Sequence, residues 1–324
     1  SAGARGARSP PGISGAAWTH CRSSTEQLWL RGEADCRSDD CGFLRLRLTL
    51  LCLPQRSSID SVERTVYAEI RSWGEDSLFR QRLRLALESH LIWETYALSY
   101  DQVLPRLDFY QEVVERHSRA FRDAARGSIL DLGAGTGNVT IRLLEQGHRV
   151  TALDISRAML DRLLSKVDRQ PDGVVSIVRH DAADLVQWTS ASFDGVTILL
   201  ALFDMANPAA ALGEAMRVLR PGGMLVVTEP KRTFDLSSLL RYAERCLREQ
   251  GAYDALQEHW ARVSKVNRKI DPSARRERIF IEDIRERLEL SGFSITREED
   301  SHHGNCATVW AVRNSACGAT VGGR

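Results

Sequence analysis

Short apolar runs alternate with helix-like segments through the middle of this 324-residue chain. Each run is apolar on both faces, and segments whose apolar residues stand three and four positions apart lie in the gaps between several of them. Strands joined by helical crossovers run in the same direction, so this alternation predicts a parallel sheet covered by helices on both faces. The expected strands are SILDL (128–132), RVTAL (149–153), VVSIV (174–178), FDGVTILL (193–200) and GMLVVT (223–228).

The alternation predicts the rest of the fold as well. Helical patterns cover 136–146, 156–168 and 207–219, and the rhythm breaks after residue 228. It resumes near residue 280 with a helix and two strands that only a short turn separates, which favours an antiparallel edge hairpin. We therefore expect an α/β fold with a Rossmann-like, doubly wound, mostly parallel seven-stranded sheet with an antiparallel edge strand, a helical N-terminal lid and a helical cap insertion.

The pattern also divides the chain into segments. The first residues are small, polar and rich in turn formers, which is typical of a disordered leader. The expected segments are a leader (1–60), an N-terminal helical lid region (61–126), the cofactor-binding core (127–228), the cap insertion (229–279), the last helix with the edge strands (280–313) and a tail (314–324).

The composition is that of an ordinary globular protein. Apolar residues make up 43% of the chain, charged residues 27%, and the formal net charge is +1. Such a balance gives no global field for non-specific binding of nucleic acid. No apolar run approaches the roughly 20 residues that cross a bilayer. The seven cysteines lack the paired spacing of a metal site, so we expect reduced thiols in a cytoplasmic protein and no bound metal.

Three glycines, Gly133, Gly135 and Gly137, stand between the first expected strand and the helix that follows it. Glycines at such a turn let the backbone approach a ligand without a Cβ in the way, and the amides of the helix N-terminus point at that ligand. The loop alone fits a nucleotide fold or a structural tight turn.

Three acidic residues sharpen this choice. Asp131 lies inside the first strand, where a carboxylate would repel a docked pyrophosphate and would suit a ligand with an ammonium group. Asp154 ends the second strand, 21 residues after Gly133, where acidic residues bind ribose hydroxyls. Asp181 ends the third strand, within reach of an adenine amino group. Asp154 and Asp181 also fit the alternative role of helix N-caps.

At this point the sequence resembles class I S-adenosylmethionine-dependent methyltransferases, over about residues 90–313. The resemblance implies S-adenosylmethionine as the cofactor, and its motifs follow one another in the family's order and spacing. These motifs are YALSYDQVLPRLDFYQEVV, ILDLGAGTG, TALDIS, RHDAADL and VLRPGGMLVVTEP.

The resemblance also implies which residues hold the cofactor. They lie at or just after the ends of expected strands, in the helix before the first strand, or, for Met159, in the helix expected at 156–168. They are Gly133, Ala134 and Gly135 for the methionine part, Asp131 for its amino group, Tyr100 for its carboxylate, Asp154 for the ribose, Ile155, Met159, Asp181 and Ala182 for the adenine, and Leu200 for the methyl channel.

Methyl transfer from a sulfonium needs position and dryness from the protein more than acid–base chemistry. Aromatic faces stabilise a sulfonium, and Trp93, Tyr96, Tyr100 and Phe203 are the candidates. The alternative for Trp93 and Tyr96 is packing in the core or the lid.

The cap is the part of the sequence that departs most from a minimal fold. Residues 231–278 contain 12 Lys and Arg against 7 Asp and Glu, a local net charge of +5. His259 is the one histidine of the cap and our candidate general base, while Tyr253 and Trp260 are candidates to line the acceptor site. Each also fits a plain packing or surface role. His302 and His303 are adjacent, so their side chains should point apart rather than share a metal.

We expect a methyltransferase that acts on an oxygen, nitrogen or carbon atom of a small molecule. Within the family, the chain looks most like the quinone-biosynthesis and natural-product enzymes. It lacks an Asn/Asp-Pro-Pro-Tyr/Phe motif in 199–208 and a Pro-Cys pair, so a nucleic-acid acceptor is not favoured. A nucleic-acid or protein methyltransferase and a non-catalytic cofactor-binding protein remain alternatives. A dehydrogenase is disfavoured because the glycine spacing is not G-x-G-x-x-G. The oligomeric state is left open.

Overall fold

The computed structural model describes residues 92–93, 96–123, 126–167, 174–272 and 279–315. The expected leader (1–60), most of the N-terminal lid region and the end of the tail lie outside these residues.

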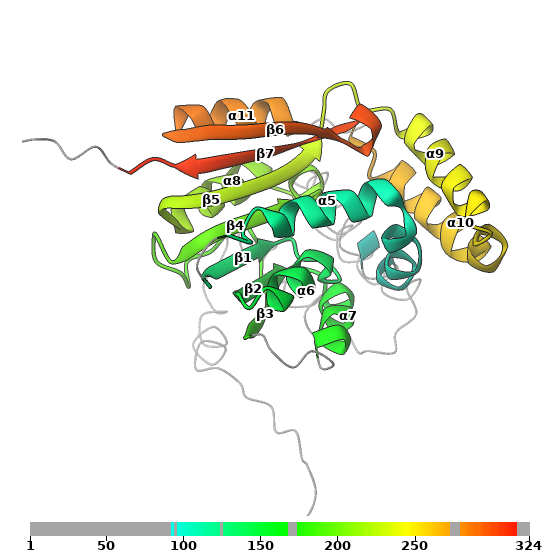
Figure 1. The fold of residues 1–324 in the computed structure, drawn as a ribbon, viewed down its shortest axis with the longest axis horizontal. Coiled ribbons are helices and arrows are strands. Elements are labelled where there is room, and N and C mark those ends of the chain that lie inside the picture. The colour runs from blue at the N-terminus through cyan, green and yellow to red at the C-terminus, as the bar shows by residue number, and fades with distance from the viewer. Residues whose placement is uncertain (1–91, 94–95, 124–125, 168–173, 273–278, 316–324) are drawn as a thin grey trace, which may run out of the picture. The chain divides into compact units, whose positions relative to one another are not determined.

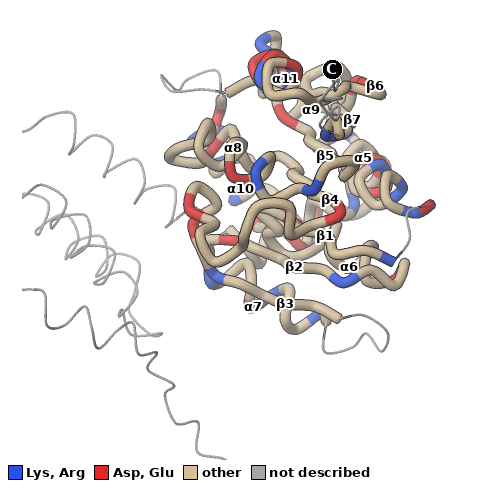
Figure 2. The backbone as a smooth tube through the Cα atoms, turned by 90° about the vertical axis from the view of Figure 1, so that its left-hand side faces the viewer, with Lys and Arg blue, Asp and Glu red and all other residues tan. Residues whose placement is uncertain are grey.

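A seven-stranded sheet with the order β3-β2-β1-β4-β5-β7-β6 organises the described part of the chain. The neighbours from β3 to β5 pair in parallel, whereas β7 pairs antiparallel with both β5 and β6. Figure 2 shows the strands following one another in this order from β3 to β6. The strands are β1 (Ser128–Leu132), β2 (Arg149–Asp154), β3 (Val175–Arg179), β4 (Phe193–Leu199), β5 (Leu219–Pro230), β6 (Phe293–Ser301) and β7 (Cys306–Arg313).

The expected fold class is therefore confirmed, with two refinements. The antiparallel strand is β7, and the edge itself is β6. β5 begins at Leu219 rather than at residue 223, because Leu219 pairs with Phe193 ahead of a register shift in the β4–β5 ladder.

Helices cover both faces of the sheet. α5 (Asp108–Arg119) and α6 (Asn138–Glu145) lie on one side, with α8 (Pro208–Val218) and α11 (Ile281–Leu290) on the other (Figure 2). α7 (Arg157–Val167) packs on β2 and β3. Each face has its own apolar core, since Leu212 and Ile284 belong to one buried cluster and Phe121 and Leu143 to another.

The cap consists of α9 (Leu236–Glu249) and α10 (Tyr253–Lys269), two packed helices that follow β5. They lie on the side to which the carboxyl ends of the parallel strands point (Figure 1). The helical residues 92–93 and 96–103, called the lid below, meet this cap. The Ser99 hydroxyl hydrogen bonds to His259 Nδ1 at 3.1 Å, and Asn267 Nδ2 donates to the Tyr96 hydroxyl at 3.1 Å. Segments far apart in sequence thus form one wall over the strand ends.

A buried polar chain fastens α5 to the sheet. His117 is fully buried, and its Nδ1 and Nε2 hydrogen bond to the hydroxyls of Thr197 (2.6 Å) and Thr228 (2.7 Å). The Thr228 hydroxyl hydrogen bonds in turn to Thr308 at 2.7 Å, so the chain runs across β4, β5 and β7. Burial first, and then the charge of Arg116, lowers the pKa of His117 to about 3, so the imidazole is neutral.

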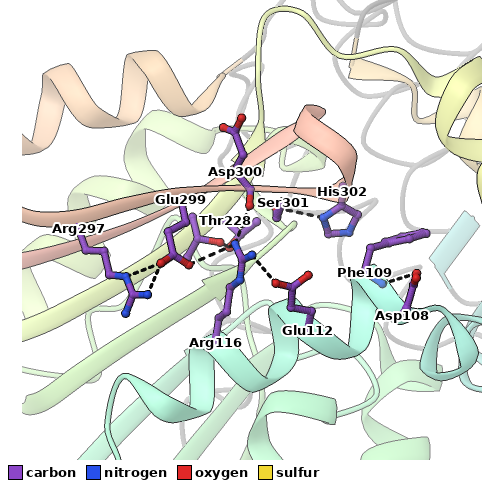
Figure 3. A network of polar contacts seen from close by, with 11 residues as sticks. Asp108, Phe109, Glu112, Arg116, Thr228, Arg297, Glu299, Asp300, Ser301 and His302 are labelled. Carbon is purple, nitrogen blue, oxygen red and sulfur yellow. Dashed lines mark hydrogen bonds and ion pairs between the residues drawn. The ribbon is translucent and has the colours of Figure 1, made fainter.

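Arg116 attaches the other side of α5 to the edge hairpin, as Figure 3 shows. Its Nη1 donates to the Asp300 carbonyl at 2.7 Å and lies 3.6 Å from Glu299 Oε2, and its Nη2 donates to Glu112 at 2.5 Å. Since the pair with Glu112 is within α5, the contacts with Glu299 and Asp300 are the ones that join helix to hairpin.

The adjacent histidines of the edge hairpin lie in η4 (His302–Gly304) and have left-handed backbones, with φ of +49° for His302 and +55° for His303. His302 is buried against Phe109 at 4.9 Å between ring centroids, whereas His303 is exposed and lies 3.7 Å from the Tyr242 ring. Among the described residues, no group of three or more His, Cys, Asp or Glu is arranged to hold a metal.

Candidate functional site

The glycines of the loop after β1 have two different roles. All three glycines have positive φ: +75° at Gly133, +54° at Gly135 and +81° at Gly137. A Cβ at Gly133 would lie 2.5 Å from Ala201 Cβ, and one at Gly137 would lie 2.1 Å from Leu163 Cδ1. At Gly135 no atom lies within 4 Å of that position. Gly133 and Gly137 are therefore required by packing, and Gly135 borders open space.

Asp154 ties the end of β2 to this loop. Its Oδ2 accepts a hydrogen bond from the Gly135 amide and its Oδ1 accepts one from the Ser156 amide, both at 2.8 Å. The N-cap of α7 is Ser156, whose hydroxyl accepts from the Met159 amide at 3.3 Å. Ser156 thus takes the N-cap position, and the Asp154 carboxylate lies beside the open space at Gly135.

The expected adenine residues lie at the ends of β2 and β3. Asp181 Oδ1 accepts from the Ala183 amide at 2.9 Å in a turn, and no helix follows, so the helix-cap alternative for Asp181 is also wrong. Ile155 is 49% exposed, which leaves an apolar face for a ligand. Met159 and Ala182 are buried, so less of their surface is open to one.

Asp131 is buried in β1, and Thr140 on α6 donates to its Oδ2 at 2.5 Å. Burial raises its pKa to about 7, although the Thr140 hydrogen bond acts in the opposite direction. No ion pair joins it to a cation among the described residues, so a ligand ammonium nearby would stabilise its ionised form.

Tyr100 belongs to a set of tyrosines on the lid side of the site. Its hydroxyl hydrogen bonds to that of Tyr110 at 2.8 Å, and Asn138 Nδ2 donates to Tyr110 at 3.0 Å. Burial raises the pKa of Tyr110 to about 12 and that of Tyr100 well above its usual range, so both are neutral donors.

A lysine that the sequence did not single out anchors the lid to the glycine loop. Lys166 Nζ donates to Asp101 Oδ1 at 2.8 Å, to the Thr136 carbonyl at 2.9 Å and to Asn138 Oδ1 at 3.1 Å. The Thr136 hydroxyl also donates to Asp101 at 2.6 Å. These residues come from three segments of the chain, namely the helix before β1, the glycine loop with the start of α6, and α7, so no local spacing marks the lysine.

The segment after β4 forms the opposite wall. Leu200 has φ +49°, a conformation that costs a non-glycine residue roughly 1–2 kcal/mol, and its amide donates to the Thr228 carbonyl at 2.9 Å. Glu229, fully buried at the end of β5, accepts from the amides of Ala201 (2.9 Å) and Leu202 (2.8 Å) on Oε1 and of Phe203 (3.2 Å) on Oε2. The carboxyl group of Glu229 thus fixes the turn at residues 201–203. In the sequence, the position of this glutamate at the end of an apolar strand was the one feature that could have indicated this role.

Aromatic side chains connect the two walls. Trp93 Nε1 donates to Asp204 Oδ2 at 2.6 Å, within η2 (Leu202–Asp204). Trp93 lies 5.6 Å from Tyr96, and Tyr96 lies edge-on to Tyr100 at 5.4 Å. Phe203 packs against the same cluster. The structure therefore brings all four expected aromatic residues together.

The cap candidates have different surroundings. His259 lies at the contact between lid and cap, where its Nδ1 meets Ser99. Trp260 is buried within the cap and donates to Glu244 at 3.3 Å, and Tyr253 stacks against Arg248 at 3.5 Å. Tyr253 and Trp260 thus pack inside the cap, and the role of His259 as general base stays a prediction.

The strand order, the single antiparallel strand and the glycine loop after β1 define a class I methyltransferase fold. Residues 130–227 match the family model described as a methyltransferase domain, so this segment is such a domain. The resemblance of the sequence to S-adenosylmethionine-dependent methyltransferases is confirmed. The site fits that cofactor, because the backbone leaves open the space that a Cβ at Gly135 would fill, and the carboxylate of Asp154 borders it.

Similar proteins include demethylmenaquinone methyltransferases. The chain is 41% identical to that of Clavibacter sepedonicus over 115 residues, which are 35% of this chain and 44% of the relative. It is 34% identical to that of Renibacterium salmoninarum over 142 residues, 41% of this chain and 57% of the relative. The chain thus spans about half the length of these relatives.

Similar solved structures share low sequence identity with the chain. The PH0226 protein of Pyrococcus horikoshii OT3 has a TM-score of 0.48 and 18% identity, over 70% of this chain and 99% of that one. The magnesium protoporphyrin IX methyltransferase of Synechocystis PCC 6803 has a TM-score of 0.45 and 20% identity, over 64% and 84%. None of the described helices combines the length and apolar composition of a bilayer-spanning segment.

Proposed function

We propose that this chain transfers a methyl group from S-adenosylmethionine to a small aromatic acceptor of the demethylmenaquinone type. The observation that carries the cofactor part is the open space at Gly135, bordered by the carboxylate of Asp154. The cofactor supplies an activated methyl group on a sulfonium.

The residues around that space divide the work of binding. The backbone of Gly133 to Gly135 holds the methionine part, Asp131 faces its ammonium group, and Asp154 accepts from the ribose hydroxyls. Ile155 offers an apolar face to the adenine beside Asp181 and Ala182. Leu200 borders the path of the methyl group, and the adjoining turn excludes water.

The acceptor part rests on the aromatic cluster and on the named relatives. Trp93, Tyr100 and Phe203 are half-buried and give flat apolar surfaces between the lid and the turn after β4, whereas Tyr96 is buried and packs against Trp93 and Tyr100. Such surfaces suit stacking against an aromatic ring. The relatives carry the name demethylmenaquinone methyltransferase, which supplies the acceptor to test first.

The test has two stages. The full chain is titrated with S-adenosylmethionine by calorimetry and then incubated with methyl-labelled cofactor and reduced demethylmenaquinone. We expect micromolar cofactor binding and gain of one methyl group by the quinone. Absence of cofactor binding refutes the proposed function, whereas binding without transfer refutes the acceptor alone.

One observation favours a second candidate, a nucleic-acid acceptor. Arg262, Lys265, Arg268 and Lys269 are exposed on α10, and none of them forms an ion pair with a described residue. In Figure 2, however, Lys/Arg and Asp/Glu segments are interspersed along the backbone. An RNA oligonucleotide in the same labelling experiment decides between the two acceptors.

Asp154→Ala should weaken S-adenosylmethionine binding by about 10- to 100-fold, because hydrogen bonds to a carboxylate contribute about 1.5–3 kcal/mol. Asp154→Asn is the matched control, because it keeps one acceptor oxygen and the side-chain size. Its affinity for S-adenosylmethionine should lie between those of the wild type and Asp154→Ala. Calorimetry measures the affinity and a thermal melt confirms folding. Equal affinity in the wild type and Asp154→Ala would remove Asp154 from the binding site.

A further inference from the structure

Glu229 is a buried carboxylate whose partners are amides rather than cations. Three backbone N–H groups, those of Ala201, Leu202 and Phe203, donate to it, and its side chain is fully buried. No Lys, Arg or His among the described residues forms an ion pair with it. Burial without a countercharge favours the protonated form of a carboxyl group, so its ionised form needs a cation that only a ligand would bring.

The turn that Glu229 holds touches the cofactor loop. Ala201 Cβ lies 2.5 Å from the place that a Cβ at Gly133 would take, and Met205 Cε lies 3.5 Å from it. Gly133 and Ala134 are in turn fixed on β2, because both of their amides donate to the Leu153 carbonyl at 2.8 and 2.9 Å. Glu229 is therefore separated from the methionine end of the cradle only by the turn it holds.

We propose that Glu229 is a positioning residue that fixes the turn at residues 200–204 and provides the buried negative charge for the sulfonium of the cofactor. This inference rests on the proposed function. In this proposal, Glu229 at the end of β5 supplies the negative charge that balances the sulfonium, and the amides of the turn hold its carboxylate in place.

The two forms of the cofactor separate this role from the other acidic residues. S-adenosylmethionine carries a sulfonium charge, whereas S-adenosylhomocysteine has a neutral sulfur, and both carry the same amino group. At pH 6.5 the amino group is protonated in both ligands, so Asp131, which faces it in the proposed function, meets the same charge in both. A difference between the two ligands therefore reports on the group near the sulfur.

Burial raises the pKa of Glu229 to about 8, with the charge of Asp204 adding to the effect and the three amides opposing it. The other groups near it are Cys306 on β7, whose thiol is buried and neutral, and Lys231, which pairs with Asp300 at 2.7 Å. A cation bound near Glu229 favours its ionised form, so binding of the sulfonium releases a proton below pH 8.

The experiment counts protons by calorimetry at pH 6.5, where Glu229 and the amino groups of both ligands are protonated. S-adenosylmethionine and S-adenosylhomocysteine are each titrated into the full chain in phosphate and in imidazole, whose ionisation enthalpies differ. We expect S-adenosylmethionine to release up to one proton more than S-adenosylhomocysteine. Equal proton release by the two ligands overturns the inference.

Glu229→Gln tests the assignment. It keeps an oxygen for the amides of Ala201 and Leu202 but carries no charge, so the difference in proton release should vanish. The affinity for S-adenosylmethionine relative to S-adenosylhomocysteine should fall about tenfold for each pH unit by which the sulfonium shifts the carboxyl pKa. A loss of equal size for both ligands indicates a structural role and overturns the inference.

Asp194→Asn is the matched control. Asp194 also accepts a backbone amide, that of Ser128 at 2.7 Å, but it lies at the amino end of β4, away from the site. It should retain the wild-type difference between the ligands. If Glu229→Gln does not fold in a thermal melt, the wild-type proton count decides. If the wild type binds neither ligand, the proposed function fails and the inference with it.

Discussion

Gly135→Val is expected to abolish S-adenosylmethionine binding while the chain stays folded. The Cβ at this position meets no atom within 4 Å, so the valine side chain projects into the space assigned to the cofactor rather than into the core. A steric clash that costs the complex about 3 kcal/mol lowers the affinity for the cofactor by more than about a hundredfold. Calorimetry with the purified variant measures it.

A second valine variant separates the blocked space from backbone strain. Gly292 has φ +79° and also has no atom within 4 Å of a Cβ, but it stands between α11 and β6. Gly292→Val carries a comparable left-handed penalty, roughly 1–2 kcal/mol, and should bind the cofactor as the wild type does. Retained binding in Gly135→Val, or equal loss in both variants, contradicts the glycine cradle.

The free energy of unfolding should be highest between about pH 4.5 and 6.5, because four buried groups act in opposite directions. Burial lowers the pKa of His117 and of His302 to about 3, and raises that of Asp131 to about 7 and of Glu229 to about 8. Each group shifts stability by about 1.4 kcal/mol per pH unit between its folded and unfolded pKa.

The signs follow from which state holds the proton. Below pH 6.5 the unfolded chain protonates both histidines and the folded chain does not, so stability falls with acid until about pH 3. Above the unfolded carboxyl pKa, near 4, the folded chain keeps protons on Asp131 and Glu229, so stability falls as pH rises to about 7 and 8. The effects cancel between about pH 4.5 and 6.5, and about 2–3 kcal/mol is lost from pH 6.5 to 8.

Urea unfolding of the cofactor-free chain from pH 4 to 9 measures this profile. Glu229→Gln should reduce the fall in the free energy of unfolding above pH 6.5. His117→Gln should reduce its fall in acid by the contribution of one histidine. A free energy of unfolding that rises from pH 6.5 to 8 would show that these carboxyls are ionised in the folded chain.

The sheet was predictable because each strand and each crossover helix is indicated by residues that are neighbours in the sequence. Strands apolar on both faces and the helices between them repeat along the chain, and the turn at Gly133–Gly137 needs a residue type that few other turns need. Asp154 and Asp181 stood out because each ends such a strand. Their positions followed from the strand order alone.

The missed residues act through contacts between segments far apart in sequence. Lys166 is one cation of an amphipathic helix until folding brings Asp101 and Thr136 to it. Glu229 follows the same rule as Asp131, an acid in an apolar strand, but the amides it holds follow a different strand, β4. Ser156, the residue directly before α7, accepts from the Met159 amide, while Asp154 two positions earlier reaches the Gly135 amide in the loop after another strand.

The lid helix uses neighbouring faces for separate tasks. Asp101 joins it to Lys166 and the glycine loop, whereas Trp93, Tyr96 and Tyr100 contact one another through their rings, with Tyr96 buried between the other two. Under the proposed function, a substitution at Trp93 changes the surface that meets the acceptor and leaves the anchor at Asp101 in place. Descendants of such a chain would then diverge in their acceptor while inheriting the same cofactor cradle.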